Sequence, residues 1–302
     1  MLGLYRHPFR AMGSRCELRL YARSEQEASA AAHGAAADVQ RLEAKYSRYR
    51  DDSVTAAINR VGATGGAIAV DDETASLLDY GATCFAQSDG LFDLTSGVLR
   101  EAWGAHCRGL PGAGTLERLL QRVGWDKLRW SRPCLEFLLP GMELDFGGVV
   151  KEYAADRAAV ICAEAGIRHG LVDLGGDIRI IGPHPDGAPW RVGIQHPRRP
   201  DGVMATLDVA RGAVATSGDY ERYLAIDGRR YCHIVSPRTG MPVQGLAGVS
   251  VLAQECVVAG SATTIAMLME ARGPVWLEEV GLPHVWMDQD ERVGGTYGAA
   301  VR

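Results

Sequence analysis

The chain has 302 residues, of which 47% are hydrophobic and 23% charged, and its formal net charge is −5. These values are ordinary for a globular protein with a sizeable core. The acidic balance and the lack of any long basic stripe argue against nucleic acid as a partner. No run of about 18 apolar residues occurs, so we expect no membrane segment.

The cysteine pattern argues against a disulfide framework and against a structural zinc site, because the count is odd and no Cys-x-x-Cys pair occurs. The seven cysteines are Cys16, Cys84, Cys107, Cys134, Cys162, Cys232 and Cys256. The first residues contain no apolar segment of the kind found in signal peptides. Reduced thiols and no signal segment together predict a cytoplasmic protein.

The first half of the chain is dominated by helical patterns. Apolar and polar residues alternate over 10–22, which predicts a half-buried strand. Ser24 and Glu27 then form a capping-box pattern, which predicts that an alanine-rich helix begins there and ends near Tyr46. Two further helices are predicted over 72–87 and 115–123.

The second half begins with the clearest helical pattern, over 148–166, and then turns to strands. Strands are predicted over 169–173, 177–182, 190–196, 203–210, 222–227, 230–236 and 247–253, and a helix over 255–270. Turns are indicated at Asp186-Gly187, Asp201-Gly202 and Asp227-Gly228. Helices followed by antiparallel strands predict an α+β fold, with residues 1–302 in one domain.

The stretch ELDFGGVVKEYAADRA, residues 143–158, carries the first chemical signal. Gly147 and Gly148 come just before the strong helix, whose N-terminus favours an anion such as phosphate. Lys151 in the first turn would add a full positive charge. Asp145 has an alternative interpretation as a simple N-cap.

Three other stretches each have a plain structural interpretation beside the functional one. GLFDLTSGVL (90–99) can be a loop, VDLGGDIRIIG (172–182) can be a hairpin turn, and the polar stretch 214–243 can be a hairpin.

The helix VVAGSATTIAML, residues 257–268, combines apolar flanks with a small, hydroxyl-rich centre. Gly260 and Thr264 are four residues apart and Thr263 is adjacent, so the three share one face. This face can serve close packing. An acid at position 260 with a hydroxyl at 264 would instead offer oxygen ligands to a cation such as Mg²⁺, but position 260 is glycine.

These blocks, together with AMGSRCELRL and YSRYRDDSVTAAIN, occur in an order and spacing that resemble the FAD:protein FMN transferases, the ApbE family, from about residue 8 to 290. The resemblance implies an α+β fold of antiparallel sheets with flanking helices, and FAD in a cleft between two lobes. It also implies transfer of FMN from FAD to a threonine or serine hydroxyl of an acceptor protein. The product bond is a phosphoester, and AMP is released.

The resemblance further implies the roles of individual residues. His233 would assist proton transfer, although a hydrogen-bonded structural histidine is an equal alternative. The Gly148 carbonyl, Thr263 and Thr264 would hold Mg²⁺. The implied FAD contacts are Met12, Tyr49, Leu91, Phe92, Asp93, Asp145, Lys151 and Ile234.

The sequence departs from the family pattern at the metal site. The family usually has an acid at the position of Gly260, a glycine at that of Glu152 and often an acid at that of Ser236. Neutral ligands bind Mg²⁺ weakly, so the missing acid weakens the expectation of a metal. Helical geometry turns Glu152 about 100° away from Lys151, which leaves its role open.

Two alternatives are open. The missing acid favours a protein that binds FAD with weak or no transferase activity. The other is an FAD pyrophosphatase in which water replaces the acceptor hydroxyl, but it also needs a metal, so the same departure counts against it. An acid restored by Gly260→Asp is predicted to tighten Mg²⁺ binding.

Overall fold

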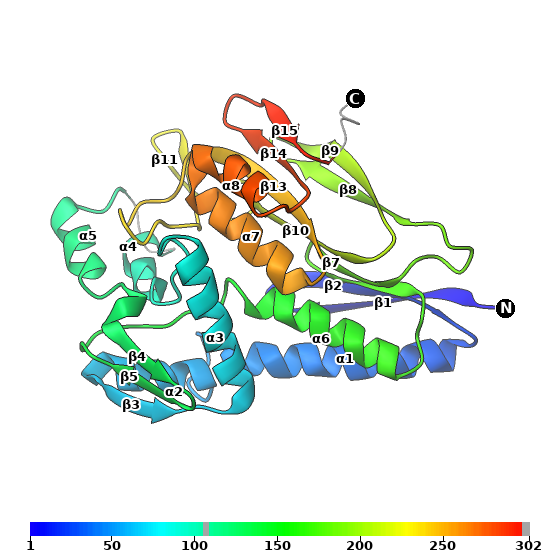
Figure 1. Cartoon of the computed structure of the whole chain (residues 1–302), viewed down its shortest axis with the longest axis horizontal. Helices are drawn as coiled ribbons and strands as arrows, with labels where there is room; N and C mark the ends of the chain where they lie inside the picture. The colour runs from blue at the N-terminus through cyan, green and yellow to red at the C-terminus, as the bar shows by residue number, and fades with distance from the viewer. Residues whose placement is uncertain (105–108, 298–302) are drawn as a thin grey trace.

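The structure is a computed structural model that describes residues 1–104 and 109–297. Within them, the largest sheet has eight strands in the order β1-β2-β6-β7-β10-β13-β14-β15, and neighbours pair antiparallel (Figure 1). The strands are β1 (Gly3–Ala11), β2 (Ser14–Ala22), β6 (Gly170–Leu174), β7 (Asp177–Gly182), β10 (Gly212–Gly218), β13 (Leu246–Ala253), β14 (His284–Asp288) and β15 (Val293–Gly295).

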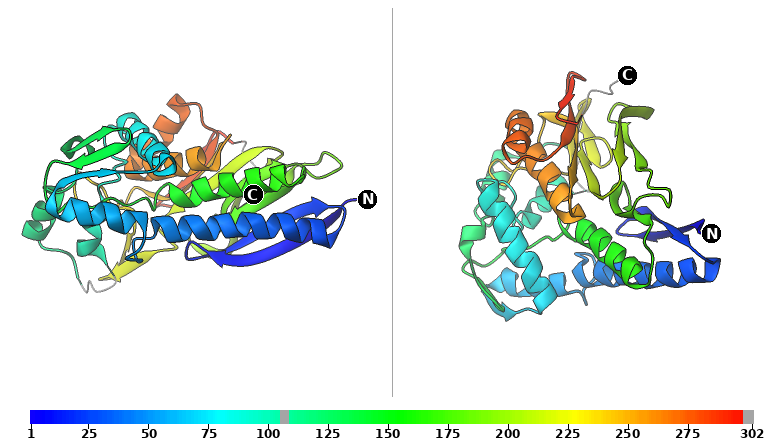
Figure 2. Two further views of the ribbon diagram at one scale, coloured as in Figure 1. Left: turned by 90° about the horizontal axis from the view of Figure 1, so that it is seen from below. Right: turned by 45° about the vertical axis from the view of Figure 1, so that its right-hand side comes forward.

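Both faces of this sheet are covered, as the right-hand view of Figure 2 shows. The helices α1 (Glu25–Tyr46), α6 (Val150–Glu164) and α7 (Cys256–Leu268) lie on one face, and the hairpin of β8 (Trp190–His196) and β9 (Arg199–Val209) lies on the other. Successive residues of a strand point to opposite faces. Accordingly, Ala213 and Ala215 of β10 join the helix-side core, whereas Val214 joins the core under the hairpin.

A smaller group of elements lies at one end of the molecule (Figure 1). It contains the helices α2 (Val54–Thr64), α3 (Asp72–Gln87), α4 (Arg100–Trp103) and α5 (Ala113–Leu120), and a sheet of β3 (Gly66–Ala69), β5 (Cys134–Phe137) and β4 (Leu128–Ser131). The hairpin of β11 (Tyr223–Ile226) and β12 (Arg229–Cys232) and the helix α8 (Gly273–Glu279) complete the described elements. One buried cluster contains residues of both groups, such as Leu78 and Val172. That the whole chain is one domain stays a prediction.

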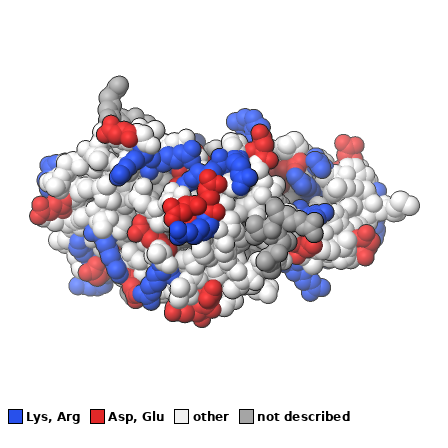
Figure 3. Space-filling model, turned by 90° about the horizontal axis from the view of Figure 1, so that it is seen from above, with Lys and Arg blue, Asp and Glu red and all other residues white. Residues whose placement is uncertain are grey.

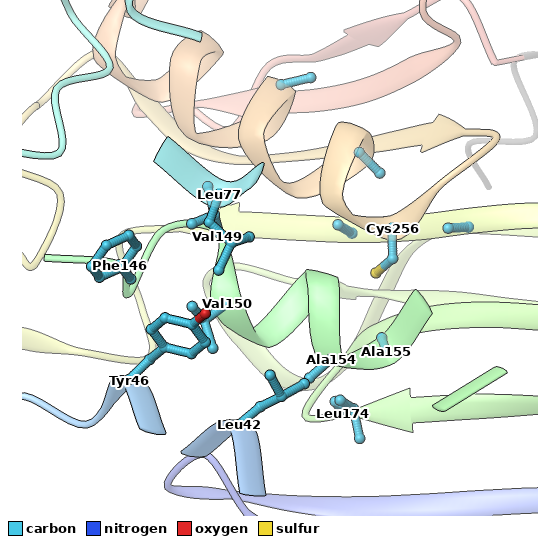
Figure 4. Packing of buried hydrophobic residues seen from close by; sticks show 14 of the residues in the cluster. Leu42, Tyr46, Leu77, Phe146, Val149, Val150, Ala154, Ala155, Leu174 and Cys256 are labelled. Atoms are coloured by element: carbon cyan, nitrogen blue, oxygen red, sulfur yellow. The ribbon is translucent and has the colours of Figure 1, made fainter. Parts of the chain in front are cut away.

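Helix α6 packs between α1 and α7, and Figure 4 shows this core from close by. Leu42 and Tyr46 of α1 approach Val150 and Ala154 from one side, and Cys256 of α7 lies on the other. Because the helix has neighbours on two sides, it buries more than the single apolar stripe that its sequence indicates. Glu152, outside that stripe, is buried as well.

Several predicted elements are confirmed. The α+β class and the antiparallel pairing agree with the structure. The capping box forms, because the Ser24 Oγ accepts from the Glu27 N–H at 3.2 Å while the Glu27 carboxylate accepts from the Arg23 N–H at 2.9 Å. The helix predicted over 72–87 is α3.

Other predicted elements are wrong in detail. The strand predicted over 10–22 crosses a hairpin turn at Met12-Gly13, where φ is 55° and 68°. The alternation continues on both sides of this two-residue turn, so the pattern conceals it. The turn predicted at Asp201-Gly202 lies inside β9. Strand β10 has the small-residue sequence GAVATSG and was not predicted.

The structure bears on the predictions about membrane segments and cysteines. No helix in the described ranges is long and apolar enough to span a membrane. Cys16, Cys84, Cys134, Cys162, Cys232 and Cys256 are free thiols, and Cys107 lies outside the described residues. The cytoplasmic location stays a prediction.

Glu73, in the first turn of α3, connects three helices. Its carboxylate pairs with Arg41 and Lys45 of α1, each at 2.8 Å, and accepts a bond from the Tyr153 hydroxyl of α6 at 3.3 Å. Hydrogen bonds from Arg41 and Lys45 lower the pKa of Glu73 to about 2, against the effect of burial. This cluster therefore ties the smaller group of elements to the helix layer.

We expect Glu73→Gln to lower the free energy of unfolding by about 1–2 kcal/mol at pH 7, because the carboxylate is partly exposed and its pair partly screened. The folded pKa lies below the unfolded one, so the contribution is complete above the unfolded pKa near 4.5. It is lost as the pH falls toward 2. Urea unfolding from pH 7 down to pH 3.5 measures this, with exposed Glu164→Gln as the control. A difference that does not shrink on acidification would contradict the assignment.

Candidate functional site

The loop that leads into α6 is fixed by Asp145. Its N–H donates to the Leu94 carbonyl at 2.8 Å, one carboxylate oxygen accepts from the Gly147 N–H at 2.9 Å, and the other pairs with Arg48 at 2.7 Å. The helix starts at Val150 with Val149 as its N-cap, so the interpretation of Asp145 as the N-cap is wrong. The Gly147 N–H is already bonded to Asp145 and is therefore not free for an anion. The positively charged groups near this loop are Arg48 and Lys151.

The stretch 91–93 packs beside this loop. A side chain at Gly148 would place its Cβ 3.3 Å from the Phe92 ring, so glycine permits the close approach. The buried Asp93 carboxylate accepts from the Thr95 N–H and hydroxyl at 2.8 and 2.7 Å and from the Trp125 N–H at 3.1 Å. Burial raises the pKa of Asp93. Phe92 and Asp93 thus hold the loop, and Leu91 is the more exposed of the three.

Lys151 pairs with Asp177 at the start of β7, and this ion pair joins α6 to the sheet. The Asp177 side chain is only 3% exposed and also accepts from the Thr216 N–H at 3.2 Å. Burial alone would lower the pKa of Lys151, but the charges of Asp177 and Glu152 outweigh it and raise that pKa.

Asp177 was missed in the sequence. Gly175 and Gly176 form the predicted hairpin turn, with φ of 68° and 93°. A hairpin turn by itself accounted for the glycines of the motif at 172–182, with no need for a bound ligand. The overlooked signal is an acid placed directly after the turn, at the head of an otherwise apolar strand.

Glu152 is the second buried acid beside Lys151. Its residue is 8% exposed. Burial, and then the charge of Asp177, raise the pKa of Glu152 to about 8. The Lys151 ammonium therefore serves two carboxylates, one on its own helix and one on the sheet.

The hydroxyl-rich face of α7 lies against β10 and α6. The Thr263 hydroxyl donates to the Gly260 carbonyl and contacts the Ser217 hydroxyl, both at 2.8 Å, while the Thr264 hydroxyl lies 3.5 Å from Ser217. A Cβ on Gly260 would lie 2.4 Å from the Glu152 Cγ. The effect of Gly260→Asp on metal binding stays a prediction, and in this structure the new side chain would require the Glu152 side chain to move.

His233 is exposed and lies just after β12. Its N–H donates to the Arg222 carbonyl at 3.1 Å. Protein atoms around the ring lower the pKa of His233, and the positive charges of Arg222, Lys151 and Arg48 lower it further. The three cations come from separate parts of the chain, and their positive charges all act on the same imidazole.

The remaining predicted FAD contacts occupy different settings. Half-buried Met12 is in the β1–β2 turn, where the Arg222 guanidinium would lie 3.9 Å from a Cβ on Gly13. The Tyr49 ring is 88% exposed, with the Arg48 guanidinium 5.8 Å from its centroid. Ile234 is buried, and its carbonyl accepts from the Val243 N–H.

The predicted site residues fall into three local groups. Around the start of α6 lie Asp145, Gly148 and Phe92, together with Arg48. The turn that contains Met12 lies near Arg222, which is bonded to His233. On α7, the hydroxyls of Thr263 and Thr264 lie near that of Ser217. Within residues 1–104 and 109–297, no three His, Cys, Asp or Glu side chains are grouped as metal ligands. Basic and acidic side chains are mixed over the face in Figure 3. A surface hollow of about 650 Å³ lies over α5 and Thr239 and is lined by none of the predicted site residues.

The chain is similar to known proteins over most of its length. The model of the ApbE family matches residues 12–286. The chain belongs to the ApbE family. A relative from Vibrio cholerae serotype O1, named FAD:protein FMN transferase, is 31% identical over 244 residues, which cover 78% of this chain and 73% of the relative.

Two further comparisons describe the extent of the likeness. A Rhodobacter capsulatus protein with the same name is 34% identical over 68% of this ApbE-family chain, but the match covers 40% of that longer relative. The crystal structure of the ApbE protein from Thermotoga maritima superposes with a TM-score of 0.89 at 28% identity, and covers 97% of both chains.

We expect Lys151→Met to destabilise the protein more than Asp177→Asn does. Loss of the lysine leaves the buried Asp177 carboxylate without its cation, beside the Glu152 carboxyl, which costs about 3–5 kcal/mol for a buried pair. Loss of the Asp177 charge leaves Lys151 beside Glu152. Urea unfolding at pH 7 measures both.

Arg129→Met is the control, since it breaks the exposed pair with Glu136 and should change stability by less than about 1 kcal/mol. If Lys151→Met changed the free energy of unfolding as little as this control does, the pair of Lys151 with Asp177 would not be important for stability.

Proposed function

We propose that this protein is an FAD:protein FMN transferase, which moves FMN from FAD to a threonine or serine hydroxyl of an acceptor protein. The observation that carries the proposal is the match to the ApbE family and to a relative named FAD:protein FMN transferase. The positive charges of Arg48, Lys151 and Arg222 all act on His233, and they suit a pyrophosphate whose phosphoryl group is transferred, because such a reaction needs positioning and charge neutralisation.

The proposed reaction forms a bond between the acceptor hydroxyl oxygen and the phosphorus of the FMN moiety. The bond from that phosphorus to the bridging oxygen breaks, and AMP leaves with the electron pair. Neutral His233 accepts the proton of the hydroxyl, which is a poor nucleophile at neutral pH. Arg48, Lys151 and Arg222 would bind and orient the phosphates.

FAD would be held by Met12, Tyr49, Leu91, Phe92, Asp93, Asp145, Lys151 and Ile234. The exposed Tyr49 ring offers a face for stacking, and the Met12 thioether suits contact with an aromatic ring. The buried members, Phe92, Asp93 and Ile234, would act by shaping the walls of the site.

Magnesium is part of the proposal. The Gly148 carbonyl and the Thr264 hydroxyl provide oxygen ligands, whereas the Thr263 hydroxyl is already bonded to Gly260 and Ser217. The buried Glu152 Oε2 has no hydrogen-bond partner, and this orphaned oxygen fits a cation nearby. A bound Mg²⁺ would supply charge neutralisation at the pyrophosphate.

The direct test incubates the purified protein with FAD, Mg²⁺ and a threonine-containing acceptor domain. We expect FMN to become covalently attached to the acceptor and AMP to be released in equal amount, as measured by mass spectrometry and chromatography. An acceptor with its threonine changed to alanine is the control. Free FMN with AMP would instead indicate a pyrophosphatase, and bound FAD without AMP a binding protein.

We expect His233→Gln to lower the transfer rate by about 100-fold or more, as for loss of a general base, while FAD affinity changes little. The pKa of His233 lies below its ordinary value, so the imidazole is neutral at pH 7. Activity of the unmodified protein should therefore fall as the pH drops through that pKa, and this fall should be absent in the variant. Exposed His33→Gln is the matched control. An unchanged rate in His233→Gln would exclude the role.

A further inference from the structure

The Glu152 side chain fills the space that a side chain at position 260 would occupy. A Cβ built on Gly260 would lie 2.4 Å from the Glu152 Cγ, 2.9 Å from its Cδ and 3.1 Å from its Oε1. The carboxylate therefore extends from α6 to the backbone of α7. Only a residue without a side chain at 260 allows this contact.

The Glu152 carboxyl is only partly bonded by the protein. The residue is 8% exposed, and its Oε2 has no hydrogen-bond partner. The Tyr80 hydroxyl, a nearby donor, is directed to the Val257 carbonyl at 3.1 Å and the Ser261 hydroxyl at 2.6 Å. An ionised carboxylate without compensation is costly in a protein interior.

The balance of charges around Glu152 is compatible with one more cation. Lys151 is ion-paired with Asp177, and that pair already neutralises the one positive charge that reaches this junction from α6. Glu152, once ionised, would add a negative charge that a divalent cation would stabilise. Further oxygen atoms on α7 are the Thr264 hydroxyl, 3.5 Å from Ser217, and the Thr263 hydroxyl and Gly260 carbonyl, which are bonded to each other. Oxygen-rich sites with carboxylates suit hard divalent cations.

We propose that Glu152 supplies, from α6, the carboxylate ligand of a divalent cation at the α6–α7 junction, and that Gly260 provides the room for it. The acid that is absent from α7 is thus present at the same place on the neighbouring helix. The use of the cation for FAD chemistry rests on the proposed function, but its binding by Glu152 can be measured without any transfer reaction.

The two positions should tolerate exchange only together. Gly260→Asp alone inserts a Cβ at 2.4 Å from the Glu152 side chain and adds a further buried acid, so this variant should lose stability. The double variant Glu152→Gly/Gly260→Asp removes the collision and returns one carboxylate to the junction from α7. We expect it to fold and to bind the cation within a few-fold of the original protein.

The test titrates the whole protein with Mn²⁺, with and without FAD, and measures binding by calorimetry and by loss of the free-Mn²⁺ EPR signal. Glu152→Gln keeps the shape of the side chain but removes its charge, so Mn²⁺ affinity should fall by at least about tenfold. Glu255→Gln, an exposed acid at the start of the same α7 helix, is the control and should bind as the original does.

Thermal unfolding separates a ligand from a structural acid. Without metal, Glu152→Gln should be at least as stable as the original, because it replaces a buried carboxyl by a neutral group of the same shape; with Mn²⁺ it should lose the stabilisation that the original gains. Equal Mn²⁺ affinity of Glu152→Gln and the original, or no Mn²⁺ binding by the original with or without FAD, would overturn the proposal. Binding through Glu152 without FMN transfer would refute the proposed function alone.

Discussion

The contact between Lys151 and Asp177 is the interaction on which the site depends. It joins the first turn of α6 to the head of β7, where the Asp177 side chain is only 3% exposed and would be costly without a charge partner. The sheet therefore cannot shift relative to this helix without separating the charges. With Glu152 added, one lysine serves two carboxylates. Buried charges of this kind add little net stability, because apolar residues of similar size would stabilise the core equally well. Their presence therefore favours a role in function.

The same pair decides where the other charged groups lie. Because α6 is fixed on the sheet, the loop before it is fixed too, and Asp145 holds Arg48 at its entrance. Arg222 lies just before β11 and His233 just after β12, and the His233 backbone N–H donates to the Arg222 carbonyl. The positive charges that act on exposed His233 therefore come from three parts of the chain, not from any one motif. Positive potential of this kind attracts and orients phosphate groups.

The junction of α6 and α7 shows how a departure from a family pattern can conceal a retained chemical group. Position 260 lacks a side chain, and by itself this suggests a lost ligand. Across the junction, a glutamate fills the vacated volume, and the second oxygen of its carboxyl, Oε2, has no hydrogen-bond partner. Volume and charge are thus balanced between two helices rather than at one position. Cation binding at this junction depends on the presence of a carboxylate, and it matters less which of the two helices carries it.

The sequence alone determined the features whose causes are local. The Ser24–Glu27 cap, the bounds of α3 and the Gly175-Gly176 turn follow from neighbouring residues, and the ordered motifs identified the ApbE family. Only the tertiary structure decided which groups meet. Strand β10, with its small residues, is defined by its partners, and the contact of Glu152 with Gly260 joins helices far apart in the chain. Periodicity along one element fixes the directions of its side chains, but the packing of whole elements fixes what those side chains face.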